Sequence, residues 1–148
     1  MFGKLLLWDT LHPLNTRLAL GYTIYTPVHV KNFNTYGGGF KTRGVVFPGN
    51  AFNADLGLEL SISQRWVIAL DSVYTFTNRT HFHGNPGMTS SGTKASVGKG
   101  YSDQLSFAPA IEYNFSDKMG LIGGAWFSVY GRNSSNFVSG ILSGYFKF

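Results

Sequence analysis

The residues best suited to chemistry in this sequence are His81 and His83, which flank a single phenylalanine. Two histidines at this spacing can share one face of a β-strand, and imidazole is a common ligand of zinc and copper. A metal site needs further donors, but the surrounding residues 78–102 contain no acidic residue, and His12 and His29 are remote in sequence. We therefore expect this pair to bind no metal.

Signatures of catalysis are weak in the rest of the chain. The lack of cysteine excludes a thiol nucleophile, a thiolate metal site and a disulfide framework. No Gly-x-Ser-x-Gly nucleophile elbow is present. Glu59 and Glu112 could form an acid–base pair, but carboxylates inside a barrel more often pair with Arg or Lys. We expect no enzyme and no cofactor, with a small outer-membrane lipase or acyltransferase as the enzymatic alternative.

Two other ligand classes are also disfavoured. Residues 37–39, three consecutive glycines, are not followed by the helix of a phosphate-binding loop, so we interpret them as a flexible loop tip. Positive charge could indicate nucleic acid, which stacks its bases on aromatic side chains. The aromatic residues here follow the apolar side of predicted strands, which favours contact with lipid, so no nucleic-acid partner is expected.

Apolar and polar residues alternate along seven segments, and this period of two predicts β-strands with two different faces. In the clearest segment, Leu105, Ile111 and Phe115 lie on one face, and Gln104 and Glu112 lie on the other. Residues 119–131 leave the faces open, because apolar side chains occupy both. The predicted strands cover residues 1–9, 17–25, 51–62, 66–77, 103–115, 119–131 and 136–148.

The composition favours a membrane barrel over a soluble β-protein. Charged residues make up 13% of the 148 residues, whereas about 25% is usual in soluble domains. Apolar runs such as Leu5 to Trp8 are far too short for a spanning helix, and only helices and closed barrels satisfy their backbone in lipid. Aromatic residues lie towards the strand ends, where a barrel has its girdles: Tyr22, Trp66, Tyr74, Phe76, Tyr113 and Phe115. The charges expected on the lumen side are Arg17, Asp55, Glu59, Asp71, Glu112 and Lys147.

The connections alternate between short and long. Tight turns at 61–65 and 116–119 contrast with long segments at 27–50 and 78–102, the arrangement of outer-membrane barrels with long extracellular loops. The long segments and the 132–135 connection contain no acidic residue. They carry Lys31, Lys41, Arg43, Arg79, Lys94, Lys99 and Arg132. A rim whose charged side chains are all positive attracts anions, so lipopolysaccharide is an expected partner. The alternative explanation is that the basic residues only keep the protein soluble.

The C-terminal strand carries a possible assembly signal. The chain ends Tyr145-Phe146-Lys147-Phe148, with Leu142 and Val138 at alternate positions before Phe146. A terminal aromatic residue in this setting resembles the strand that the outer-membrane assembly machinery recognises, although Gly140 and Gly144 interrupt the pattern. We expect Phe146 and Phe148 to form that signal.

Three stretches resemble the outer-membrane family associated with the meta-pathway of phenol degradation. They are residues 57–66, residues 108–117 (Ala-Pro-Ala-Ile-Glu-Tyr-Asn-Phe-Ser-Asp) and residues 131–133, followed by the glycine-rich last strand. The resemblance implies a barrel of roughly a dozen strands that passes small apolar or aromatic molecules across the bacterial outer membrane. Because single-chain bacterial barrels have an even number of strands, about eight or more, we hypothesise that upstream strands and a signal peptide are missing.

These observations predict one domain, residues 1–148, that is all-β: an antiparallel up-and-down transmembrane β-barrel, seven strands of a larger one. The predicted function is a channel for small apolar or aromatic solutes, with the lipid bilayer, lipopolysaccharide and the assembly machinery as partners. The alternatives are a lipopolysaccharide- or host-binding barrel without a pore, and a soluble barrel that encloses an apolar ligand.

Overall fold

The computed structural model of the chain describes residues 3–7 and 14–147. This part of the chain contains strands and no helix, and therefore no helix that could cross a membrane. The strands are β1 (Gly3–Leu7), β2 (Leu14–Thr23), β3 (Val28–Lys31), β4 (Arg43–Phe47), β5 (Ala51–Ser61), β6 (Trp66–Thr77), β7 (His81–Asn85), β8 (Ser102–Ser116), β9 (Met119–Arg132) and β10 (Val138–Phe146). They form two antiparallel sheets, so the predicted all-β antiparallel class is confirmed.

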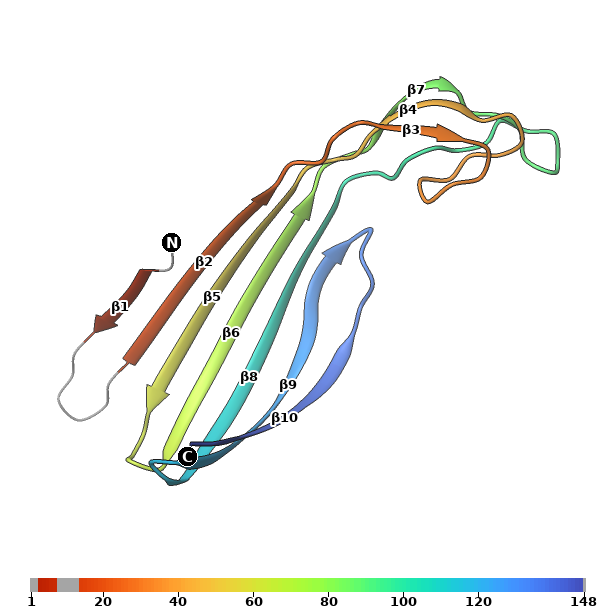
Figure 1. The fold of residues 1–148 in the computed structure, drawn as a ribbon. Helices are drawn as coiled ribbons and strands as arrows, with labels where there is room; N and C mark the ends of the chain where they lie inside the picture. The colour runs from red at the N-terminus through yellow and green to blue at the C-terminus, as the bar shows by residue number, and fades with distance from the viewer. Residues whose placement is uncertain (1–2, 8–13, 148) are drawn as a thin grey trace. The chain divides into compact units, whose positions relative to one another are not determined.

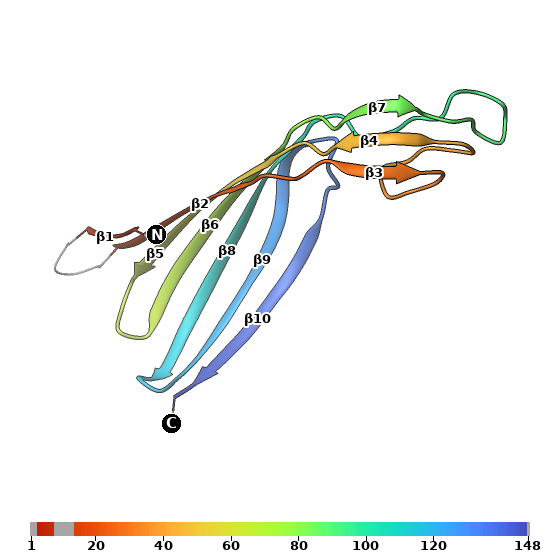
Figure 2. The same cartoon turned by 45° about the horizontal axis from the view of Figure 1, so that its top comes forward.

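The larger sheet has seven strands in the order β1-β2-β5-β6-β8-β9-β10 (Figure 1). These are the seven strands predicted from the alternation, so that prediction is confirmed, with ends shifted by a few residues. Strands β1 and β10 are the two edges, and the described residues therefore form an open sheet and not a closed barrel. Figure 2 shows the strands of this sheet running side by side from β2 to β10.

Six strands of the large sheet are unusually long, from 9 residues in β10 to 15 in β8. Strands of soluble proteins are most often about five or six residues long, whereas a strand that crosses a bilayer needs about 9–11. The turns between them are tight: the Ile62 N–H donates to the Trp66 carbonyl oxygen at 2.9 Å, closing the β5–β6 hairpin. The sheet thus combines long strands with minimal connections at one end.

The two faces of the large sheet differ in composition and exposure. One face carries large apolar side chains that are open to the surroundings, including Leu20 (65% exposed) on β2 and Leu142 (77% exposed) on β10. The opposite face carries the polar residues, and some of them are well covered: Ser106 on β8 is only 3% exposed. The alternation of the sequence predicted two faces of different composition.

The second sheet, β3-β4-β7, lies within segments that the sequence indicated as long loops. That prediction was incomplete, because 14 residues of these segments are strands. Val46 of β4 pairs with Val28 and Phe82 of its neighbours and is fully buried, so a small apolar core holds the sheet together.

The three glycines at 37–39 do not form the expected flexible tip. The Gly38 N–H donates to the Ser96 carbonyl oxygen at 2.8 Å, and Gly39 is buried against the backbone of Met88, where a Cβ would lie 2.1 Å from the carbonyl oxygen. Glycine is required here because the two backbones approach so closely.

The chain forms two compact units. The first contains the residues before Tyr22, Asn53–Thr75 and the residues after Asp103; the second contains Tyr22–Phe52 and Phe76–Asp103. The first unit holds most of the large sheet, and the second holds the small one.

Candidate functional site

Three of the six charges predicted for the lumen meet on the polar face of the large sheet. The Arg17 guanidinium Nη2 lies 3.4 Å from Asp71 Oδ1 and 3.7 Å from Asp55 Oδ2. The three residues come from the adjacent strands β2, β5 and β6. Gly57 leaves room for this cluster, because a Cβ at its position would lie 2.7 Å from Asp71 Oδ1. Two carboxylates thus share one guanidinium.

The cluster retains unused capacity to accept hydrogen bonds. Asp55 Oδ1 is buried and has no hydrogen-bond partner among the described residues. The Arg17 side chain is 56% exposed, so the cluster remains open to the space above the polar face. The unpartnered oxygen itself is covered, so the exposed Arg17 guanidinium is the part of the cluster that a solute can reach.

The other three predicted lumen charges lie outside this cluster. Glu59 on β5 alternates with Asp55 and Gly57 and so shares their face, and Glu112 on β8 shares the face of Ser106. Lys147 follows β10, and its Nζ lies 5.7 Å from the centre of the Tyr145 ring.

Aromatic side chains also lie on the polar face, which the sequence did not reveal. The Trp126 Nε1–H donates to Ser106 Oγ at 3.0 Å, which places the indole of β9 on the face of Ser106. The Phe137 ring packs edge-on against this indole, with ring centroids 5.0 Å apart. We call Trp126, Phe137 and Ser106 the aromatic cluster. The alternation along β9 left the direction of Trp126 open because both faces of that strand are apolar.

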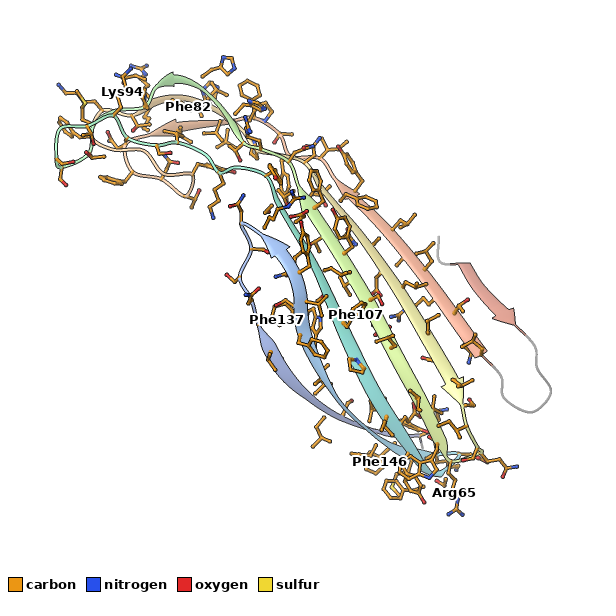
Figure 3. All side chains as sticks on the ribbon, turned by 180° about the vertical axis from the view of Figure 1, so that it is seen from behind. Arg65, Phe82, Lys94, Phe107, Phe137 and Phe146 are labelled. Carbon is orange, nitrogen blue, oxygen red and sulfur yellow. The ribbon has the colours of Figure 1, made fainter. Side chains whose placement is uncertain are left out.

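Backbone contacts fix Phe137 in place. Its N–H donates to Ser128 Oγ at 3.0 Å, and its carbonyl oxygen accepts from the Ser128 N–H at 3.1 Å. Farther along the connection, the Gln104 Nε2–H donates to the Ser135 carbonyl oxygen at 2.6 Å. Figure 3 shows Phe137 beside β9 and β10. The aromatic cluster is therefore built from strands β8 and β9 and from the connection between β9 and β10.

A third group on the polar face lies near the short turns. The Tyr145 hydroxyl is hydrogen-bonded to Asn114 Oδ1, joining β10 to β8 across β9. The intervening Gly120 makes this possible, since a Cβ there would lie 2.5 Å from the tyrosine ring.

The opposite, apolar face carries aromatic residues at the same end of the sheet. Trp66 and Tyr113 pack with centroids 4.7 Å apart, and Tyr113 meets Phe115 at 5.0 Å. Phe146, half of the predicted assembly signal, is 68% exposed at this end (Figure 3). Phe148, the other half, lies outside the described residues. This end therefore presents a band of exposed aromatic rings.

The predicted basic loop residues fall into two groups. Arg132 ends β9 in the first unit, and its guanidinium lies 5.8 Å from the centre of the Tyr130 ring. The other six lie in the second unit: Lys31, Lys41, Arg43, Arg79, Lys94 and Lys99. Two of these six, Lys31 and Arg43, are directly opposite each other in the β3–β4 pairing.

The strand pairing of the small sheet also places the histidines. His81 and His83 share one face of β7, and the register aligns His29, Val45 and His83 across the three strands. His83 packs edge-on against Phe47 at 5.4 Å. No group of three or more His, Cys, Asp and Glu residues suited to a metal occurs in the part of the chain that the structure describes.

No protein-family model, curated protein or solved structure matches this chain.

Proposed function

We propose that this chain forms part of the wall of a bacterial outer-membrane β-barrel that admits small apolar or aromatic solutes. The observation that carries the proposal is the exposed apolar face of the large sheet, which extends from Leu18 and Leu20 on β2 to Leu142 and Phe146 on β10. Such a face is stable against lipid chains and costly against water, at about 25 cal/mol for each Å².

Three further features support a membrane wall. The long strands match the thickness of a bilayer. The aromatic band of Trp66, Tyr113 and Phe115 fits one interfacial girdle. The resemblance of residues 57–66 and 108–117 to the outer-membrane family of phenol degradation agrees with this location and with export through the assembly machinery.

The proposed lumen side offers contacts for a solute with both apolar and polar parts. The aromatic cluster provides indole and phenyl surfaces against which an aromatic ring can pack edge-on or offset. The Arg17–Asp55–Asp71 cluster provides charged, partly exposed polar side chains. A small phenol-like solute uses both kinds of contact.

The test is solute uptake by liposomes that contain the protein. We expect entry of phenol or toluene to exceed that of empty liposomes, and the double variant Trp126→Ala/Phe137→Ala to change the selectivity between these solutes and glycerol. Trp66→Ala, which removes an indole from the apolar face, is the matched control and should leave selectivity unchanged. Uptake no faster than that of empty liposomes would contradict the channel.

A barrel without a pore is the second candidate. The composition of the second unit favours it, because this unit contains six Lys and Arg residues and a single acidic residue, Asp103. In that case the basic residues bind a surface and the large sheet serves as an anchor. Surface binding without any solute uptake would support this function over the channel.

A further inference from the structure

One face of the small sheet collects basic side chains from all three of its strands. We call this set the basic face: His29 and Lys31 on β3, Arg43 on β4, and His81 and His83 on β7. The register places His29, Val45 and His83 in one row, and Lys31, Arg43 and Asn85 in the next. All five basic side chains are exposed, whereas Val30 and Val46 on the other face are buried.

Acidic side chains of the second unit do not balance the charges on this face. Strands β3, β4 and β7 contain no acidic residue, and the single acid of the second unit, Asp103, is buried and outside these strands. Lys31 is directly opposite Arg43, and like charges in this position destabilise an antiparallel pair. An anion between the two side chains would turn this repulsion into attraction.

The shape of the face suits a compact anion. An open depression of about 580 Å³ is lined by His29, Val30, Lys31, Arg43, Gly44 and Val45. Arginine pairs with phosphate through two parallel N–H groups, and lysine adds a mobile point charge. A phosphate monoester or diester fits this depression easily.

A metal ion suits the face poorly. His29 and His83 are separated by a whole strand, about 10 Å at the usual strand spacing, and Lys31 and Arg43 would repel a cation. Single-stranded nucleic acid also needs aromatic platforms for its bases, and Phe47 is the only aromatic residue on this face of the three strands.

We propose that the basic face binds the phosphate groups of an anionic lipid surface. The other residues on this face of the three strands are Val45, Phe47 and Asn85, none of which is acidic. The lipid as the source of phosphate rests on the proposed membrane function; the preference for phosphate does not.

The experiment measures binding of fluorescent lipopolysaccharide to the full chain in detergent micelles. Lys31→Gln/Arg43→Gln should weaken binding about tenfold, the loss of one to two charge-assisted contacts. Lys94→Gln/Lys99→Gln removes the same net charge away from the three strands and should have an effect of less than about twofold.

Three results would overturn the proposal. Equal weakening by Lys94→Gln/Lys99→Gln would show that only net charge matters. Undiminished binding of chemically dephosphorylated lipopolysaccharide would exclude phosphate as the ligand. Full competition by inorganic phosphate at the same molar affinity would exclude a lipid surface. Far-UV circular dichroism of each variant confirms that it folds, and because binding is measured in micelles, the result is independent of any channel activity.

Discussion

At the scale of single residues, Arg17 is the position at which charge and structure are most closely coupled. Its guanidinium is shared by Asp55 and Asp71, and the three side chains are only partly covered, with exposed fractions of 31% to 56%. Exposed ion pairs each contribute about 0.2–1 kcal/mol. The larger effect of removing the arginine comes from the two carboxylates that remain together without a counter-charge.

We therefore expect Arg17→Met to lower the free energy of unfolding by about 1 kcal/mol, and Asp71→Asn to lower it by less. Adding Asp71→Asn to Arg17→Met should restore part of the loss, since only one carboxylate then remains. Urea titration in micelles, followed by circular dichroism, measures these values. Arg65→Met, at the exposed β5–β6 turn, is the control. A double variant less stable than Arg17→Met would contradict this account.

At the scale of elements, strand β9 has two adjacent glycines with opposite surroundings where it lies beside β8. A Cβ at Gly124 would lie 2.5 Å from the Pro109 carbonyl oxygen, whereas a Cβ at Gly123 would meet no atom within 4 Å. The neighbour at Gly124 is backbone, so the strands themselves would have to separate.

Gly124→Ala should accordingly destabilise the sheet by about 1–3 kcal/mol, the usual cost of forcing extra volume into a packed site. Gly123→Ala should be neutral or slightly stabilising, because glycine in a strand costs conformational entropy of about 0.5–1 kcal/mol. The same urea titration compares the two neighbours directly. Equal effects at both positions would mean that β8 and β9 are not packed as described.

The elements also show how far the sequence could predict the structure. The strands of the large sheet are long, so alternation over ten or more residues was enough to identify β5, β6 and β8. Strands β3, β4 and β7 have only four or five residues, and β4 pairs with a segment some forty residues away, which periodicity cannot reveal. The row of His29 and His83 was missed for the same reason.

The candidate site was predictable to the extent that its residues lie on strands of clear polarity. Arg17, Asp55 and Asp71 alternate with Leu or Ile neighbours, so their common face followed from the sequence. The sequence neighbours of Trp126 on β9 are apolar residues and glycines, so its face became clear from its hydrogen bond to Ser106.

At the scale of the whole molecule, the proposed membrane location predicts which tryptophan contacts lipid. Trp66 lies on the apolar face of the large sheet and Trp126 on the polar face. In bilayers of lipids with brominated chains, a variant that retains only Trp66 should lose most of its fluorescence. A variant that retains only Trp126 should lose little.

The other tryptophans are replaced by phenylalanine in each variant, and unbrominated lipid provides the control intensity. Stronger quenching of Trp126 than of Trp66 would mean that the polar face meets the lipid, which reverses the proposed wall. Equal and weak quenching would place the sheet outside the bilayer.

The direction of the two edge strands limits the number of strands with which this sheet could close into a fully antiparallel barrel. Neighbouring strands alternate in direction, so the first and seventh, β1 and β10, run the same way, as their arrows show in Figure 1. Bringing these edges together, or joining copies by rotation about a common axis, would create a parallel seam. An odd number of additional strands, by contrast, gives an even total and lets every pair remain antiparallel. An even or odd number of strands between β1 and β10 would therefore decide whether a closed barrel contained a parallel pair.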